Sequence, residues 1–262
     1  MKFVAPLIVL VVLMVQINRS ISAKKKAKPL IFHNKTICTP KNEARIERLY
    51  GKVTIIGPNG SKFPENTDQL KKFCSDMKKN LKEIEHYTKQ CYTKEVQQYS
   101  SLAIYTIRST IRRYCSKRMS KFMADLMSVA PCGNRYVQPN DVCVRNFIEK
   151  TAPLVYIDDD KKKIPHICCN YYTASNCLEE FLNSIKCLGP YAGNVMDIFR
   201  TSTQQVVDFS CGEYTDQTDG CKRLGPMPKP RQPNKKRYVS IPTVLVDVLD
   251  SIEDYIVPGE FN

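Results

Sequence analysis

Apolar positions recur every three, four or seven residues over two neighbouring stretches, Leu70–Cys91 and Val96–Cys115. This is the spacing of one face of an α-helix. Lysines fill the opposite face of the first stretch, as is ordinary for a solvated helix surface. The pattern predicts two helices, the first beginning near Thr67 or Asp68 and the second capped by Thr93, because these side chains suit an N-cap.

A second pair of periodic stretches follows, Cys169–Leu188 and Val195–Cys211, with a break at Gly189–Pro190. The cysteines of the two pairs have nearly the same spacing. Cys74, Cys91 and Cys115 are 17 and 24 residues apart, and Cys169, Cys187 and Cys211 are 18 and 24 residues apart. We therefore expect an all-α fold, a disulfide-stapled helical bundle built from two related helical hairpins.

An antiparallel hairpin brings the two ends of its helices together, and this predicts two bridges. Cys74 should pair with Cys115, and Cys169 with Cys211. Cys168 is then an extra cysteine that ties its hairpin to something outside the repeat. We expect Cys38 to attach the N-terminal segment to the body of the protein.

Shifts in composition divide the chain further. We expect an exposed turn between the two halves at Asp158–Lys163. We also expect a short strand at Val53–Ile56 and a loop at Cys132–Cys143. Five prolines and several basic residues mark a linker before a C-terminal stretch with an apolar helical face. That stretch could dock on the body, bind a partner helix or touch a membrane. The expected segments are a signal peptide (1–23), an N-terminal loop segment (24–66), the first hairpin unit (67–152), the second hairpin unit (153–223), a Pro-rich basic linker (224–242) and an acidic amphipathic tail (243–262).

The N-terminus has the pattern of a secretory signal peptide. Lys2 precedes an apolar run over Phe3–Val15, and small residues follow at Ser20–Ala23. The run is shorter than the ~20 apolar residues of a membrane span, and we expect no transmembrane segment elsewhere. In an oxidising compartment an even number of cysteines indicates disulfides. The twelve are Cys38, Cys74, Cys91, Cys115, Cys132, Cys143, Cys168, Cys169, Cys177, Cys187, Cys211 and Cys221.

Secretion also makes Asn34 and Asn59 candidate glycosylation sites, because each begins an Asn-x-Ser/Thr sequon. The formal net charge is +14. The predicted signal peptide contributes Lys2 and Arg19 and no acidic residue, so a net charge of about +12 remains after its removal. A basic extracellular protein is suited to anionic glycans or acidic partners.

Catalytic, metal and cofactor chemistry find no positive support in the sequence. There is no CxxC pair, and the three histidines are scattered, which disfavours zinc. Asp158–Asp160 lacks the alternating spacing of a calcium loop. The Cys168–Cys169 pair invites comparison with secreted phospholipase A2, but Tyr172 stands where the catalytic histidine is expected. No G-x-S-x-G elbow is present, and nucleic-acid binding has the charge without a recognition motif.

The second hairpin contains the run Cys177–Leu182, then Cys187, the run Asn194–Arg200 and a closing Cys211. In these residues it resembles the arthropod 27 kDa haemolymph glycoprotein family. The resemblance covers mainly residues 167–221, and residues 73–143 show it more weakly. The Pro-rich linker and the acidic tail lie outside it. It implies a secreted, helical, cysteine-rich protein of haemolymph, and no functional residues, because that family has no settled biochemical activity.

Two functions fit these observations. The first is a non-enzymatic extracellular glycoprotein that carries a lipid or other apolar ligand between its hairpins, in a pocket lined by Met123, Phe181 and Phe199. The second is a cationic protein that binds anionic glycans or an acidic protein partner through Lys71–Lys89 and Arg108–Lys121.

Overall fold

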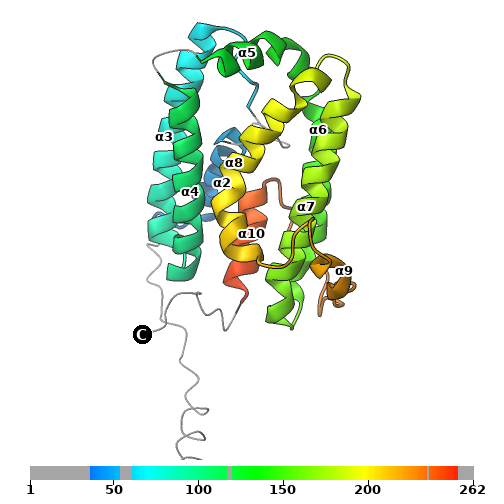
Figure 1. Ribbon diagram of the computed structural model, residues 1–262. Helices are drawn as coiled ribbons and strands as arrows, with labels where there is room; N and C mark the ends of the chain where they lie inside the picture. The colour runs from blue at the N-terminus through cyan, green and yellow to red at the C-terminus, as the bar shows by residue number, and fades with distance from the viewer. Residues whose placement is uncertain (1–35, 54–60, 117–119, 235, 253–262) are drawn as a thin grey trace, which may run out of the picture. The chain divides into compact units, whose positions relative to one another are not determined.

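The computed structural model describes residues 36–53, 61–116, 120–234 and 236–252, and these are helical with no β-strand (Figure 1). All of them belong to one compact unit. The predicted all-α, disulfide-stapled fold is confirmed. The elements are α2 (Pro40–Val53), α3 (Thr67–Cys91), α4 (Lys94–Tyr114), α5 (Lys121–Gly133), α6 (Val137–Thr151), η1 (Ala152–Tyr156), α7 (Asp160–Ser184), η2 (Gly189–Tyr191), α8 (Ala192–Cys211), α9 (Gly220–Leu224) and α10 (Ile241–Asp250).

The first predicted hairpin is the pair α3 and α4. The side chain of Asn66 caps α3 by accepting from the backbone N–H of Gln69 at 3.0 Å, one residue earlier than expected. Thr93 caps α4 as predicted, accepting from the N–H of Val96 at 3.3 Å. The inner face of the hairpin packs against α2 in one hydrophobic cluster. Its fully buried members are Ile46, Tyr50, Val53, Met77, Leu81, Ile84, Tyr87, Cys91, Ile104 and Ile111.

The second predicted hairpin is the pair α7 and α8, but α7 begins earlier than the sequence suggested. It starts at Asp160, so of the exposed turn predicted at Asp158–Lys163 only Asp158 and Asp159 lie outside the helix. Lys163 is only 2 % exposed there, because its ammonium has partners inside the fold. The break at Gly189–Pro190 is present as the short helix η2.

The two hairpins meet where α4 packs against α8. The hydroxyl of Thr106 donates to the side-chain carbonyl of Gln205 at 3.1 Å, and the Tyr99 and Phe209 ring centroids lie 5.9 Å apart. Phe209 lies in the apolar stretch Val195–Cys211, yet it is 44 % exposed. The hairpins are therefore parts of one packed body.

The N-terminal segment is not wholly a loop, because α2 occupies Pro40–Val53. Ile46, Leu49, Tyr50 and Val53 have the spacing of one helical face, and that face packs against α3. The predicted strand at Val53–Ile56 is wrong at Val53, which ends α2, and its other residues lie outside the described ranges. Cys38 ties the segment to the body through Cys91, as expected. The predicted Cys132–Cys143 loop is also shorter, since α5 reaches Gly133 and α6 starts at Val137.

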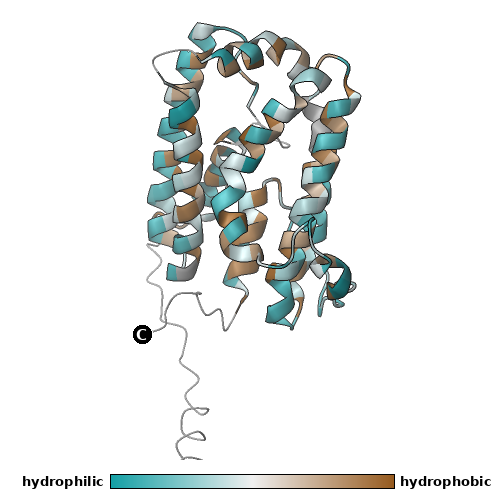
Figure 2. Cartoon of the chain, in the orientation of Figure 1, coloured by the Kyte–Doolittle hydropathy of each residue, from teal (hydrophilic) through white to brown (hydrophobic). Residues whose placement is uncertain are grey.

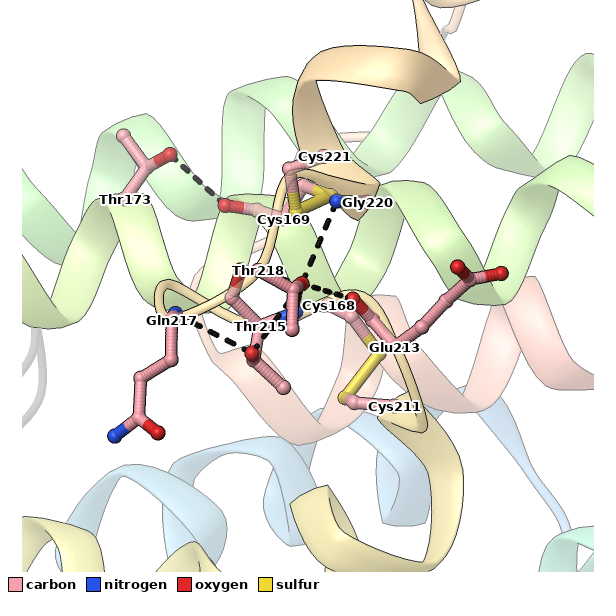
Figure 3. The surroundings of a disulfide bond; sticks show 10 residues. All are labelled: Cys168, Cys169, Thr173, Cys211, Glu213, Thr215, Gln217, Thr218, Gly220 and Cys221. Atoms are coloured by element: carbon pink, nitrogen blue, oxygen red, sulfur yellow. Dashed lines mark hydrogen bonds between the residues drawn. A yellow bond between two sulfur atoms is a disulfide. The ribbon is translucent and has the colours of Figure 1, made fainter.

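The disulfides confirm one predicted bridge and correct the other. Cys74 pairs with Cys115 as predicted. Cys169 does not pair with Cys211: Cys168 takes Cys211, and Cys169 reaches forward to Cys221 (Figure 3). Successive side chains on a helix point about 100° apart, so the two neighbours hold α8 and α9 in different directions. The remaining bridges are Cys38–Cys91, Cys132–Cys187 and Cys143–Cys177, and no cysteine is free.

The expected C-terminal tail begins as a core helix. The Pro-rich segment is non-helical between α9 and Ser240, and α10 then packs against α2, α4, α6 and η1. Val244 and Val248 on α10 are fully buried. Of the three alternatives for this stretch, docking on the body is the one that the structure contains. Residues 253–262 lie outside the described ranges.

Two polar contacts hold α10 in place. The ammonium of Lys163 pairs with Asp160 at 2.6 Å and donates to the backbone carbonyl and hydroxyl of Ser251 at 2.9 and 3.0 Å. A cation at a helix C-terminus is favourable, because the last carbonyls lack intrahelical donors. Lys236 bridges Glu43 on α2 and Asp247 on α10 at 3.0 and 2.8 Å. Burial alone would lower the pKa of Lys236, but these carboxylates raise it, so the bridge remains charged.

Replacing Lys163 by alanine should destabilise the fold by about 3 kcal/mol, because Asp160 and the end of α10 would lose a buried cation. The matched control is Lys162→Ala, whose longer, half-exposed pair with Asp159 should contribute no more than ~0.5 kcal/mol. Urea unfolding with the disulfides intact measures both. Equal effects from the two variants would contradict the role given to Lys163.

Removing Cys169 and Cys221 together by serine substitution should leave a folded protein with no free thiol. The lost bridge spans 52 residues, so the free energy of unfolding should fall by roughly 4 kcal/mol. Removing Cys169 and Cys211 instead leaves Cys168 and Cys221 without their disulfide partners, so two free thiols or a non-native bridge should appear. Thiol titration and circular dichroism distinguish these outcomes, and two thiols in the first variant would refute the pairing.

Candidate functional site

The outer face of α3 carries a continuous row of lysines. At about 100° per residue, the row occupies roughly a third of the helix circumference and extends about 27 Å from first to last. Figure 2 shows hydrophilic residues along the length of α3. All members are exposed, as the sequence predicted for a solvated face. They are Lys71, Lys72, Lys78, Lys79, Lys82 and Lys89.

The middle of this row differs from its ends. Lys71, Lys72 and Lys89 each pair with an acidic residue of α3 itself, at 3.1, 2.8 and 3.0 Å. Among the described residues, Lys78, Lys79 and Lys82 form no ion pair or hydrogen bond. Three adjacent cations are thus left without an internal counterion at the centre of the row.

Helix α4 adds arginines to the edge of the same surface. The Cys74–Cys115 bridge and a 2.7 Å ion pair between Glu85 and Arg108 fix the antiparallel register of α3 and α4. In this register Arg112, one turn beyond Arg108, lies level with the central lysines, and it is exposed. We call this surface the basic face. It comprises Lys71, Lys72, Lys78, Lys79, Lys82, Lys89, Arg108 and Arg112.

Glu85 is the acidic residue most closely tied to the basic face. Its carboxylate accepts from both Arg108 and Lys89, and these hydrogen bonds hold its pKa below the ordinary value. Glu85 therefore keeps its negative charge and neutralises one end of the face. The central lysines are not among its partners.

Some residues expected in the basic region lie elsewhere. Lys121 is exposed at the start of α5, and Arg113 lies over the Tyr114 ring at 5.8 Å. Residues 117–119 are outside the described ranges, as are both sequon asparagines, Asn34 and Asn59. The site is consequently built on α3 and α4 alone.

The three residues proposed to line an apolar pocket do not share a described hollow. Met123 is 2 % exposed in α5. Phe181 and Phe199 pack against the core cluster of α7 and α8, and Phe199 also stacks on Tyr171 with centroids 5.6 Å apart. An open hollow near the end of α7 has other walls, formed by Tyr136, Ser184, Ile185, Lys186 and Cys187.

The described side chains include one buried histidine. His166 is 8 % exposed and its Nε2 has no hydrogen-bond partner; burial, and then Lys162, lowers its pKa. Among the described residues, no nucleophile lies within hydrogen-bond reach of this Nε2. Within the described ranges, histidine, cysteine and acidic side chains nowhere form a group of three able to hold a metal ion. None of the described helices has both the length and the apolar character to cross a membrane.

Comparisons with protein-family models, with curated proteins and with solved structures find no match. The basic face is therefore characterised by its own geometry and charge.

Proposed function

We propose that this is a secreted, non-enzymatic binding protein that engages an anionic extracellular partner, a glycan in particular, through the basic face. One observation carries the proposal: Lys78, Lys79 and Lys82 lie together on one helix, and none of them forms an ion pair with a described residue. Six disulfides and the absence of a membrane-spanning helix among the described ones support an extracellular setting.

The physical basis of such binding is counterion release. A linear polyanion holds condensed cations, and a row of lysines displaces them, so affinity falls steeply as salt rises. The basic face suits this chemistry because its charges are aligned along about 27 Å of helix. The disulfide at its open end keeps α3 and α4 in register, so binding does not have to organise the surface.

Changing Lys78, Lys79 and Lys82 together to glutamine should weaken heparin binding by roughly ten- to a hundredfold at low salt, because each exposed ionic contact contributes up to about 1 kcal/mol. Retention on heparin–agarose in a NaCl gradient, followed by titration calorimetry, measures the change. The stability should be unaffected, since all three side chains are exposed.

The matched control removes the same charge elsewhere. Lys150, Lys161 and Lys222 are exposed on α6, α7 and α9, away from the α3–α4 hairpin (Figure 1). Their glutamine variant should elute close to the wild-type protein. If both triple variants lose retention equally, net charge rather than the basic face governs binding, and the proposal is wrong.

Glu85→Gln should have the opposite effect. Loss of this carboxylate frees Arg108 and Lys89 for an external anion, so the variant should elute from heparin at higher NaCl. Glu149→Gln, at an exposed position on α6, adds the same charge and should shift elution less. Weaker binding by Glu85→Gln would contradict the boundaries assigned to the face.

A further inference from the structure

Tyr105 on α4 is an exposed aromatic side chain beside the basic face. It is 56 % exposed, more than the other large apolar residues at the described surface. Nearby aromatic residues have ring partners: Tyr99 contacts Phe209, and Tyr114 stacks on Phe122. For Tyr105, no ring contact or hydrogen bond is found in the described part of the chain.

The position of Tyr105 follows from helical geometry. Residues seven apart share a face, so Tyr105 and Arg112 lie on the same side of α4, and Arg108 lies between them along the axis. The Glu85–Arg108 pair sets this side of α4 next to the lysine row of α3. Serines at positions 101 and 109, one turn to either side, are too small to cover the ring.

The ring changes what the surface recognises. Lysine and arginine alone attract any polyanion, whereas an aromatic face also packs against the flat apolar face of a ring and discriminates by shape. A tyrosine ring is well suited to this, because it loses little conformational entropy on contact and its hydroxyl remains in water. Sulfated polysaccharides present both features, a chain of sugar rings and a row of anionic groups.

We propose that Tyr105 is a stacking platform through which the basic face selects a sulfated polysaccharide over a polyanion without rings. This rests on the proposed function and specifies its ligand. Single-stranded nucleic acid also combines rings with charge, but disulfide-bonded proteins occur mainly in compartments where sulfated glycans predominate.

The test compares three probes: a heparin octasaccharide, linear polyphosphate and a single-stranded DNA oligomer. Titration calorimetry would give affinities for the wild-type protein, Tyr105→Ala, Tyr105→Phe and the glutamine triple variant of Lys78, Lys79 and Lys82. Tyr105→Ala should bind heparin roughly three- to tenfold more weakly and polyphosphate as the wild-type protein does. Tyr105→Phe should retain heparin binding, because the ring is kept. Phe209→Ala removes an exposed ring outside the basic face and should change neither affinity.

The variants separate the two proposals. If the lysine variant binds every probe as the wild-type protein does, the proposed function is wrong. If the lysine variant weakens binding but Tyr105→Ala has no effect, or weakens heparin and polyphosphate equally, only the role of Tyr105 is wrong. Tighter, Tyr105-dependent binding of DNA than of heparin would overturn the assignment to a polysaccharide.

Discussion

The structure depends on two adjacent cysteines of α7 forming bridges in different directions. Cys168 holds the C-terminal end of α8, and Cys169 holds α9 beyond the loop that begins at Gly212. Gly212 has a φ of +49°, a conformation that glycine adopts without strain, so α8 ends directly after its bridge. Once α8 is fixed, its packing against α4 positions the first hairpin. The helix that carries the lysines is then fastened at its own end by Cys74 and Cys115.

This arrangement separates stability from surface chemistry. Burial of α10 and the ion pair of Lys163 fill the interior. Met123 is buried, and Phe181 and Phe199 pack against the core cluster of α7 and α8. The outer sides of α3 and α4 contribute to the packing only through a few ion pairs, within the hairpin and between Glu83 and Arg45 of α2. They can hold unpaired cations and an uncovered ring at little cost to stability, and an interaction surface needs groups of this kind.

Much of the fold could be predicted from the sequence, because helical periodicity and capping are local. The α3–α4 hairpin, the Thr93 cap of α4 and the Cys74–Cys115 bridge follow from them. The choice between Cys168 and Cys169 does not, since the two differ by a single residue in spacing. The helical phase of α7 indicates which of the two cysteines faces the core. Cys168, Ser175 and Leu182 are seven residues apart, so they share one face, and all three are buried. The burial of Lys163 could not be anticipated, because its partner Ser251 is 88 residues away in sequence.

The lysines of the candidate site were visible in the sequence, but the site itself was not. The register of α3 against α4 determines which lysines remain unpaired, and it places Arg112 and Tyr105 beside them. The most direct test is chemical-shift mapping of isotope-labelled protein during titration with a heparin tetrasaccharide. Our account predicts that the perturbed amides cluster over residues 71–89 and 101–112. Perturbations confined to the hollow around Tyr136 and Cys187, or to α10, would contradict it.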